Sequence, residues 1–389
     1  MLSDIEPGAE RPARAWTGRR AALLAAAAAL GFALRMLAAT RGSNYDMESF
    51  FVTGGLVHDG QNVYASTTRY NYGPVWFHVL HLLFDAAQGD FATFRVLEAG
   101  LLGAVDVALF ALLIPRLGAA VALLFLFNPI SVLITGYHGQ FDAAALLLGL
   151  LAVLLLEKDA GERPTRRTWG AVALLGASLA LKHVLFAFPL WLAVKEKSWS
   201  RRLTLLLVPP ALFFLSFLPY WSAGGPAIVE NVFRYETGRS DLFVRWIVPD
   251  ALVPLVSSRL VWLAVLAISA LVFRKRGALE SLLLYTGVLV AASPVIWNQY
   301  LAIPTMLVSA LPNPFLALYT LAGTAHLLAA ADGLHLPVAA RLFPGSPEAH
   351  YGLLVKLLAL GVLWSWAARL PVLARLRARR TPAAPGEPH

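Results

Sequence analysis

The sequence of 389 residues contains no cysteine, and only 14% of its residues are charged. Without cysteine, the chain can form no disulfide and offers no thiol nucleophile or thiolate ligand for a metal. Nucleotide-binding signatures of the G-x-G-x-x-G and P-loop types are also missing. A typical soluble domain is about one quarter charged, whereas here 58% of the residues are hydrophobic and the mean hydropathy is +0.64. The composition therefore argues against a soluble protein.

Long apolar runs recur between residues 21 and 367. An apolar run of about 20 residues crosses a hydrocarbon layer of about 30 Å as a helix, and lipid leaves such a run few alternatives to helix. The formal charge of +9 and the pI near 9.9 could indicate nucleic acid, but the basic residues form short clusters between the apolar runs. The pattern predicts an all-α polytopic membrane protein, with membrane lipid rather than nucleic acid as its partner.

Five basic clusters set the predicted topology, because cytoplasmic loops carry the excess of Lys and Arg. They are residues 11–20, 158–167, 195–202, 274–276 and 369–380. One threading places all five on the cytoplasmic side, together with both termini, and Arg35 within the first apolar run favours an uncleaved anchor. The threading predicts about 11–12 transmembrane helices at 20–39, 91–114, 117–134, 140–156, 169–181, 183–194, 203–220, 258–273, 278–292, 300–312, 315–331 and 351–368.

The threading divides the chain into four parts. These are a basic cytoplasmic N-terminus (1–19), a main transmembrane module with the outer loop 40–90 (20–312), C-terminal transmembrane helices (313–370) and a disordered cytoplasmic tail (371–389). The stretch 74–88 is too short and polar for a span, so it predicts an interfacial or re-entrant helix. Lys182 and His183 interrupt an apolar segment, which predicts a broken hairpin lining a polar cavity.

The first outer loop carries two carboxylates two residues apart, Asp46 and Glu48. At a membrane surface such a pair can hold a sugar hydroxyl and remove its proton. Alternatively, Asp46 caps a helix that begins at Met47. The loop also contains aromatic residues that can stack on sugar rings or form an ordinary interfacial belt, and these are Tyr64, Tyr70, Tyr72 and Trp76.

The order of these elements resembles the GT-C superfamily. An acidic pair follows the first helix, G-x-x-x-Y spans residues 60–64, and Y-x-Y-x-P-x-W spans 70–76. Members are polytopic glycosyltransferases that use polyprenyl-phosphate or dolichyl-phosphate sugars, among them the glucosyl- and mannosyltransferases of N-glycan and GPI assembly and related bacterial mannosyltransferases. The resemblance implies a GT-C-like bundle with interfacial helices in the first outer loop. It also implies Asp46 as catalytic base and Glu48 beside it in the acceptor site.

Two further segments extend the resemblance. Residues 136–142 form a polar break between apolar runs, and residues 293–301 resemble an outer S-P-x-x-x-Q-Y-L segment of bacterial members. Their polar groups can bond sugar or acceptor, or they can close helix ends and belong to an interfacial belt. The candidates are His138, Gln140, Asp142, Asn298, Gln299 and Tyr300.

Several cations on the outer side can bind the donor phosphate, since a leaving phosphate gains from charge-assisted bonds. Anionic lipid headgroups are the alternative partner, and Arg95 can also snorkel to the interface. The candidates are Lys182, His183, Arg95, Arg234 and Arg239, with Arg245 nearby in sequence. Asp106, well inside an apolar run, is expected to face the bundle interior and to be paired rather than catalytic.

The sequence thus predicts a hexosyltransferase, most simply a mannosyltransferase of cell envelope glycans, in the bacterial cytoplasmic membrane. The sugar would pass, with inversion, from a polyprenyl-phosphate co-substrate to a lipid or glycan acceptor on the non-cytoplasmic face. No cofactor or metal is expected. The alternatives are a transporter or flippase of a lipid-linked sugar and a structural subunit. Polar residues gathered at one face, without a repeat of fixed period, favour the enzyme.

Overall fold

The computed structural model describes residues 18–159, 161–234 and 241–367, and within them the regular secondary structure is helical, without strands. Four predicted features lie wholly or partly outside the described residues. They are Arg239, the first residues of the basic N-terminus, the cluster 369–380 and the tail 371–389. The elements are α1 (Gly18–Ala39), α2 (Tyr45–His58), α3 (Val63–Ser66), α4 (Pro74–Ala86), α5 (Phe91–Leu117), α6 (Ala119–Leu126), α7 (Pro129–Gly136), α8 (Asp142–Glu157), α9 (Arg166–Leu181), η1 (His183–Leu185), α10 (Phe188–Ala193), α11 (Trp199–Leu215), α12 (Leu218–Ile228), η2 (Val229–Phe233), α13 (Leu242–Ile247), η3 (Asp250–Leu255), α14 (Ser258–Val272), α15 (Ala278–Ala291), η4 (Asn298–Ala302), α16 (Thr305–Ala310), α17 (Pro314–Ala329), α18 (Pro337–Leu342) and α19 (Pro347–Ala367).

Three of these helices, α1, α5 and α19, are long and apolar enough to cross a membrane alone. Two bent pairs reach that length together: α6 with α7, bent by 47°, and α11 with the segment Leu218–Phe233, bent by 84°. Other apolar helices, such as α14, α15 and α17, are shorter. By length and composition the described residues therefore contain three to five candidate spans, which is fewer than the 11–12 that the sequence predicts.

The predicted apolar runs do become helices, but prolines and polar residues break several of them. The run 300–312 is divided into η4 and α16 on either side of Pro304, and the run 183–194 into η1 and α10. The stretch 74–88 forms the short helix α4, and Lys182 stands between α9 and η1 in an extended conformation. The interruption predicted at Lys182 and the short helix in the first outer loop are thus both present.

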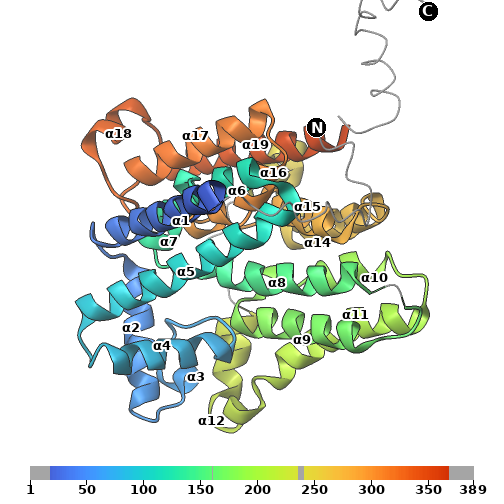
Figure 1. The fold of residues 1–389 in the computed structure, drawn as a ribbon, viewed down its shortest axis with the longest axis horizontal. Coiled ribbons are helices and arrows are strands. Elements are labelled where there is room, and N and C mark those ends of the chain that lie inside the picture. Colours follow the sequence, from blue (N-terminus) through green and yellow to red (C-terminus); the bar gives the residue numbers. More distant parts are fainter. Residues whose placement is uncertain (1–17, 160, 235–240, 368–389) are drawn as a thin grey trace, which may run out of the picture.

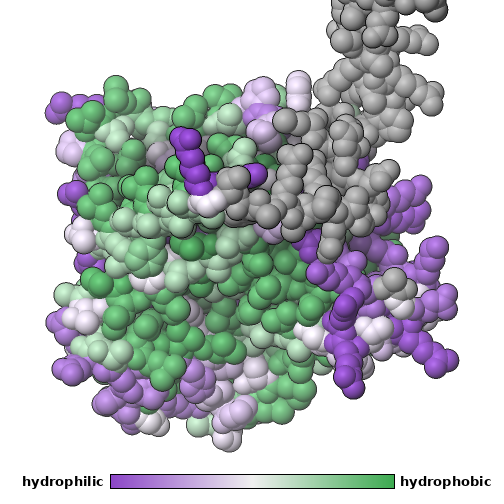
Figure 2. Space-filling model, in the orientation of Figure 1, coloured by the Kyte–Doolittle hydropathy of each residue, from purple (hydrophilic) through white to green (hydrophobic). Residues whose placement is uncertain are grey.

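The helices form layers (Figure 1). Helices α8, α9 and α11 lie side by side, and α17 packs on α19. Helix α2 packs on α4, and both lie beside α5. Figure 2 shows an apolar band across the middle of the visible face, with hydrophilic residues toward both sides. Many Leu and Trp side chains are exposed, among them Leu82, Leu207 and Leu321. A soluble protein would not expose so many large apolar side chains to water. The surface supports an α-helical membrane protein.

Basic clusters predicted to share one side do lie together. The Lys195 ammonium donates to backbone carbonyls at Phe273 and Arg276, which joins the clusters 195–202 and 274–276. The Arg201 guanidinium forms ion pairs with Asp159 and Glu196 at 3.1 and 3.0 Å, which joins the cluster 158–167. Three of the five clusters therefore form one basic end of the bundle, as the threading predicts.

The directions in which the helices run place the other polar segments at the opposite end. Helix α8 starts at Asp142 and ends before Lys158, while α9 runs from the basic end back to Lys182. Helix α1 leads to Ala39 and α5 begins near it, since Arg95 donates to the Ala39 carbonyl. The start of the segment after α1, the break 137–141 and Lys182 therefore meet at the end of the bundle opposite the basic clusters.

Candidate active site

Asp46 lies in the first turn of α2, where a neighbouring residue performs the capping. The Asn44 side-chain oxygen accepts from the Met47 backbone N–H at 3.0 Å, and the helix begins at Tyr45. The alternative that Asp46 caps a helix starting at Met47 is therefore wrong, because Asn44 fills the cap position. The Asp46 carboxylate is left available for other contacts. Glu48, two residues on, is exposed to solvent.

A continuous polar chain joins Asp46 to Lys182. The Gln140 amide nitrogen donates to Asp46 Oδ2 at 2.7 Å, and the Gln140 amide oxygen accepts from Lys182 Nζ at 2.9 Å. Lys182 Nζ also pairs with Asp142 Oδ2 at 2.8 Å. An ammonium can only donate, so the Gln140 oxygen must face Lys182 and its nitrogen must face Asp46. The structure thus brings together four residues singled out in the sequence from three separate segments.

The break between α7 and α8 positions this chain through Gly139. Its backbone has φ of 62°, a left-handed conformation that glycine adopts without strain. A Cβ at this position would lie 2.4 Å from Met47 Cε and 3.2 Å from Glu98 Oε2. Glycine at residue 139 therefore lets the 138–140 backbone lie close to the first turn of α2, where Gln140 reaches Asp46, without displacing the end of the Met47 side chain.

The surroundings of Asp46 shift its proton affinity. Burial raises the pKa of the Asp46 carboxyl above its ordinary value, and the negative charges of Asp142 and Asp332 act in the same direction. The Lys182 ammonium and the hydrogen bond from Gln140 lower the pKa without cancelling the effect of burial. A carboxylate of raised pKa is a better proton acceptor at neutral pH than an ordinary aspartate.

Glu98 is a further carboxylate that the sequence reasoning does not single out. It lies in α5, is fully buried, and neither carboxyl oxygen has a hydrogen-bond partner among the described residues. It faces Gly139 and lies within electrostatic range of Asp46. A glutamate in the run Phe-Arg-Val-Leu-Glu, near the start of a long apolar helix, is the sequence signal that could have identified it.

His138 faces the same region as a neutral imidazole. Burial lowers its pKa to about 4, while the charge of Asp332 opposes that effect. Because the Asn44 oxygen caps α2, the Asn44 amide nitrogen is the group 2.7 Å from His138 Nδ1, and it donates to that atom. The proton then resides on Nε2, which has no partner among the described residues. His138 thus holds an unpaired N–H donor two residues along the chain from Gln140.

Three aromatic residues of the first outer loop are packed rather than presented. Tyr64 and Tyr70 are buried and donate to the backbone carbonyls of Tyr72 and Gly73. Trp76 is buried and stacks on Phe141 with ring centres 4.1 Å apart. A sugar cannot stack on rings whose faces are covered, so the role predicted for Tyr64, Tyr70 and Trp76 does not fit this conformation. Their packing instead fixes the loop against residue 141 and so against Gln140.

Tyr72 lies against the polar chain. It is half-buried, and its ring centre lies 5.1 Å from Lys182 Nζ. The Phe141 ring centre lies 4.6 Å from the same atom. The two rings hold the ammonium by cation–π attraction, so Lys182 is fixed by rings, an amide and a carboxylate together.

The other predicted cations are more scattered. Arg95 donates to the Ala39 carbonyl at the end of α1. A positive charge at this position stabilises the C-terminus of the helix. His183 is half-buried beside Lys182 with its ring 6.2 Å from that of Phe213. Arg234 and Arg245 are exposed. Among the described cations, Lys182 is therefore the one that the structure places in contact with the Asp46 chain.

The segment 298–300 contributes a second network. Asn298 Oδ1 accepts from His326 Nε2 at 2.7 Å and from the Tyr351 hydroxyl at 2.8 Å, and His326 Nδ1 lies 3.1 Å from His350 Nδ1. Gln299 and Tyr300 are half-buried. His326 lies within electrostatic range of His138 and Asp332. Of this network, the sequence predicts only Asn298.

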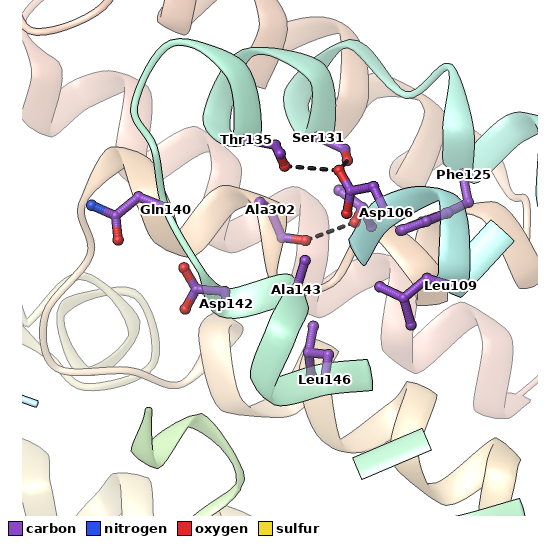
Figure 3. A pocket seen from close by; sticks show the side chains of 11 residues that line it. Asp106, Leu109, Phe125, Ser131, Thr135, Gln140, Asp142, Ala143, Leu146 and Ala302 are labelled. Carbon is purple, nitrogen blue, oxygen red and sulfur yellow. Dashed lines mark hydrogen bonds between the residues drawn. The ribbon is translucent and has the colours of Figure 1, made fainter. Parts of the chain in front are cut away.

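Asp106 is paired in the bundle interior, as predicted. Its Oδ2 atom lies 2.6 Å from Arg35 Nε and accepts from Ser131 and Thr135 (Figure 3). Arg35 also donates to backbone carbonyls at Gly31 and Leu126. The pair therefore ties α1, α5 and α7 together and has a structural role.

A small cavity separates this pair from the Lys182 chain. It has a volume of about 10 Å³, about the space of one water molecule. Asp106 and Thr135 line one side of it, and Gln140 and Asp142 line the other (Figure 3). The space is far smaller than a sugar, so substrate could bind here only after the surrounding helices moved apart.

Comparison of the chain with protein-family models, with curated proteins and with solved structures found no match. The resemblance to the GT-C superfamily therefore stays a prediction from the residues.

Proposed function

We propose that this protein is a membrane glycosyltransferase that moves a hexose from a polyprenyl-phosphate donor to a lipid or glycan acceptor. Mannose is the hexose that we propose first. The single observation that carries the proposal is the chain Asp46–Gln140–Lys182. It sets a carboxylate of raised pKa and a buried ammonium on the two ends of one amide. A base and a cation in fixed relation are what transfer from a phosphate leaving group requires.

The proposed reaction is a single displacement. Asp46 takes the proton from the acceptor hydroxyl as its oxygen forms a bond to the anomeric carbon of the donor sugar. The bond from that carbon to the phosphate oxygen breaks on the opposite side, so the configuration inverts, and polyprenyl phosphate leaves with the electron pair. Lys182 supplies positive charge toward the leaving phosphate. His138 Nε2 provides an N–H donor for the acceptor or the sugar.

The pairing of Lys182 with Asp142 bears on this scheme, because a phosphate would have to compete with a carboxylate 2.8 Å away. A buried ion pair is costly to break by removing one partner. We therefore propose that the phosphate approaches Lys182 as an additional ligand while the contact to Asp142 persists. Tyr72, half-buried with its ring centre 5.1 Å from Lys182 Nζ, is the residue of the segment 60–76 that we place beside the sugar.

The proposed orientation follows from the two ends of the bundle. The basic clusters 158–167, 195–202 and 274–276 form one end, which the positive-inside rule assigns to the cytoplasm. The site then faces the outside of a bacterial cytoplasmic membrane. Further spans beyond three to five, up to the 11–12 of a GT-C-like bundle, would require the shorter helices to cross as broken or tilted segments.

The test compares Asp46→Asn with Asp59→Asn in reconstituted vesicles. Both substitutions remove one carboxylate from α2 or its C-terminal cap, but Asp59 is exposed at the far end of the helix. Undecaprenyl-phosphate [¹⁴C]mannose serves as donor, with a bacterial lipid extract as the source of acceptor. We expect Asp46→Asn to lower transfer by about a hundredfold or more, the usual contribution of a general base, with Asp59→Asn unchanged.

Equal transfer by wild type and Asp46→Asn would contradict the proposal. Movement of the labelled lipid across the bilayer without cleavage of its sugar bond would favour the flippase instead.

A further inference from the structure

A second cluster of titratable side chains lies at the far end of the α2–α4 pair, away from Asp46. His58 is in the last turn of α2, and His81 and Asp85 lie one turn apart on α4. His58 Nδ1 is 2.7 Å from Asp85 Oδ1, and His81 Nε2 is 3.0 Å from Asp85 Oδ2. The ligand atoms of the three residues all lie within 4.8 Å of one another.

Close packing of the two helices holds this cluster in place. A Cβ at Gly54 would lie 2.8 Å from the Leu80 carbonyl oxygen, so glycine allows α2 to approach α4 backbone to backbone. The Phe84 ring then fits between Phe51 and His58, with ring centres 5.0 and 5.5 Å away. The distance between the helices at His58 is therefore set by the core of the pair rather than by the surface residues themselves.

We propose that His58, His81 and Asp85 form a binding site for one divalent transition metal ion of the zinc type, which clamps α2 to α4. Two imidazole nitrogens and a carboxylate oxygen are ordinary zinc ligands, and a water molecule can complete the tetrahedron. Ligand atoms in such a site stand about 3.3 Å apart. His58 and His81 contact different oxygens of Asp85, at 2.7 and 3.0 Å, and the three ligand atoms lie within 4.8 Å of one another. Rotation of the side chains must therefore bring the three atoms to one ion.

The exposure of the cluster allows that movement. The side chains of His58, His81 and Asp85 are 55%, 31% and 44% exposed, so the ion can reach them from water and the rings can rotate. On the helix, His58 is twelve residues from Asp46, or about 18 Å along the axis. The site is therefore separate from the proposed catalytic centre and does not depend on it. The sequence spacing hides the site, because His58 is on a different helix from the other two ligands.

The experiment uses the full chain, purified in detergent through a tag without histidine and stripped of metal with a chelator. Zinc chloride is titrated against a chromogenic chelator. We expect one zinc ion per chain, and an affinity lower by about tenfold or more in His81→Ala and in Asp85→Asn. His335→Asn, which removes an exposed imidazole elsewhere, is the matched control and should bind zinc as wild type does.

Cobalt provides a second readout that does not depend on affinity alone. Co²⁺ in a tetrahedral site absorbs strongly in the visible range, and we expect this absorption in the wild-type chain and in Asp46→Asn but not in His81→Ala. Zinc should also raise the thermal unfolding midpoint of the wild type and not that of His81→Ala. The absence of zinc binding by the wild type, or unchanged affinity in both ligand variants, would overturn the assignment. Equal loss in His335→Asn would also overturn it, since binding would then be diffuse.

Discussion

Asp46 and Lys182 are held on opposite ends of the same Gln140 amide, although they come from segments far apart in the chain. The amide nitrogen is 2.7 Å from the Asp46 carboxylate and the amide oxygen 2.9 Å from the Lys182 ammonium. Gln140 therefore fixes the distance between a proton acceptor and a cation that would otherwise attract each other directly. An amide spacer keeps the carboxylate from being neutralised by a contact ion pair.

Gln140→Leu tests the electrostatic role of this amide. The hydrogen bond from Gln140 lowers the pKa of Asp46, so its removal raises that pKa further. The carboxylate form is the active base, and the acid limb of the pH–rate profile should then move to higher pH. Transfer rates between pH 4 and 9 measure it.

Gln61→Leu is the control for this experiment, because Gln61 is exposed at the end of α2 and its backbone alone forms the Leu56 contact. A limb that moves to lower pH in Gln140→Leu, or does not move, would mean that the amide does not act on the base.

Gly139→Ala should destabilise the fold more than Gly60→Ala. Both glycines have positive φ, 62° and 68°, so both substitutions strain the backbone by about 1–2 kcal/mol. A Cβ at residue 60 meets nothing within 4 Å, whereas at residue 139 it lies 2.4 Å from the buried Met47 side chain. The clash adds about 1–3 kcal/mol. Thermal unfolding of the two variants in one detergent gives the difference, and equal midpoints would show that Met47 moves aside at no cost.

The positions of the helices could be predicted well from the sequence, because apolar length alone decides where lipid-facing helices form. The expected run 91–114 became α5, Phe91–Leu117, and the expected 140–156 became α8, Asp142–Glu157. The number of spans could not be predicted in the same way. Pro304 divides one run into two short pieces, and a sequence does not state whether such a piece crosses the membrane or turns back.

The candidate site was predicted in its members but not in its geometry. Asp46, Gln140 and Lys182 could be singled out as polar residues at breaks in apolar runs, yet their contacts depend on how three segments pack. Glu98 was missed because its place in an apolar run was the only signal, and it forms no motif with its sequence neighbours. The burial of Trp76 was missed because the sequence does not show whether a tryptophan ring packs on a neighbour or faces a sugar. In the structure the Trp76 ring packs on Phe141.

Arg35 and Asp106 offer a test of the bundle interior that is independent of function. Both side chains are buried, so Arg35→Leu leaves a charge without its partner and should cost about 3–5 kcal/mol, while the double variant Arg35→Leu/Asp106→Leu should recover much of the loss. The pair Arg116–Glu157, about one quarter exposed, is the control, and Arg116→Leu should cost less than about 1 kcal/mol. Unfolding midpoints of Arg35→Leu, Asp106→Leu, the double variant and Arg116→Leu measure this. A double variant as unstable as the sum of both single variants would mean that the pair has no special coupling.

His138 should make the fold sensitive to acid. Its pKa is about 4 in the folded protein, because burial disfavours the charged ring, against an ordinary value of 6.5. As the pH falls, the unfolded chain therefore takes up this proton first, and stability is lost between about pH 6.5 and 4. The difference in pKa corresponds to about 3 kcal/mol. His138→Gln removes the titrating ring, so its unfolding midpoint should fall less than that of the wild type across this range. The measurement is the midpoint of both proteins at half-unit steps of pH. Parallel curves would show that the ring takes up its proton without leaving its place beside Asn44, and that the free Nε2–H donor proposed for the site is not maintained by burial.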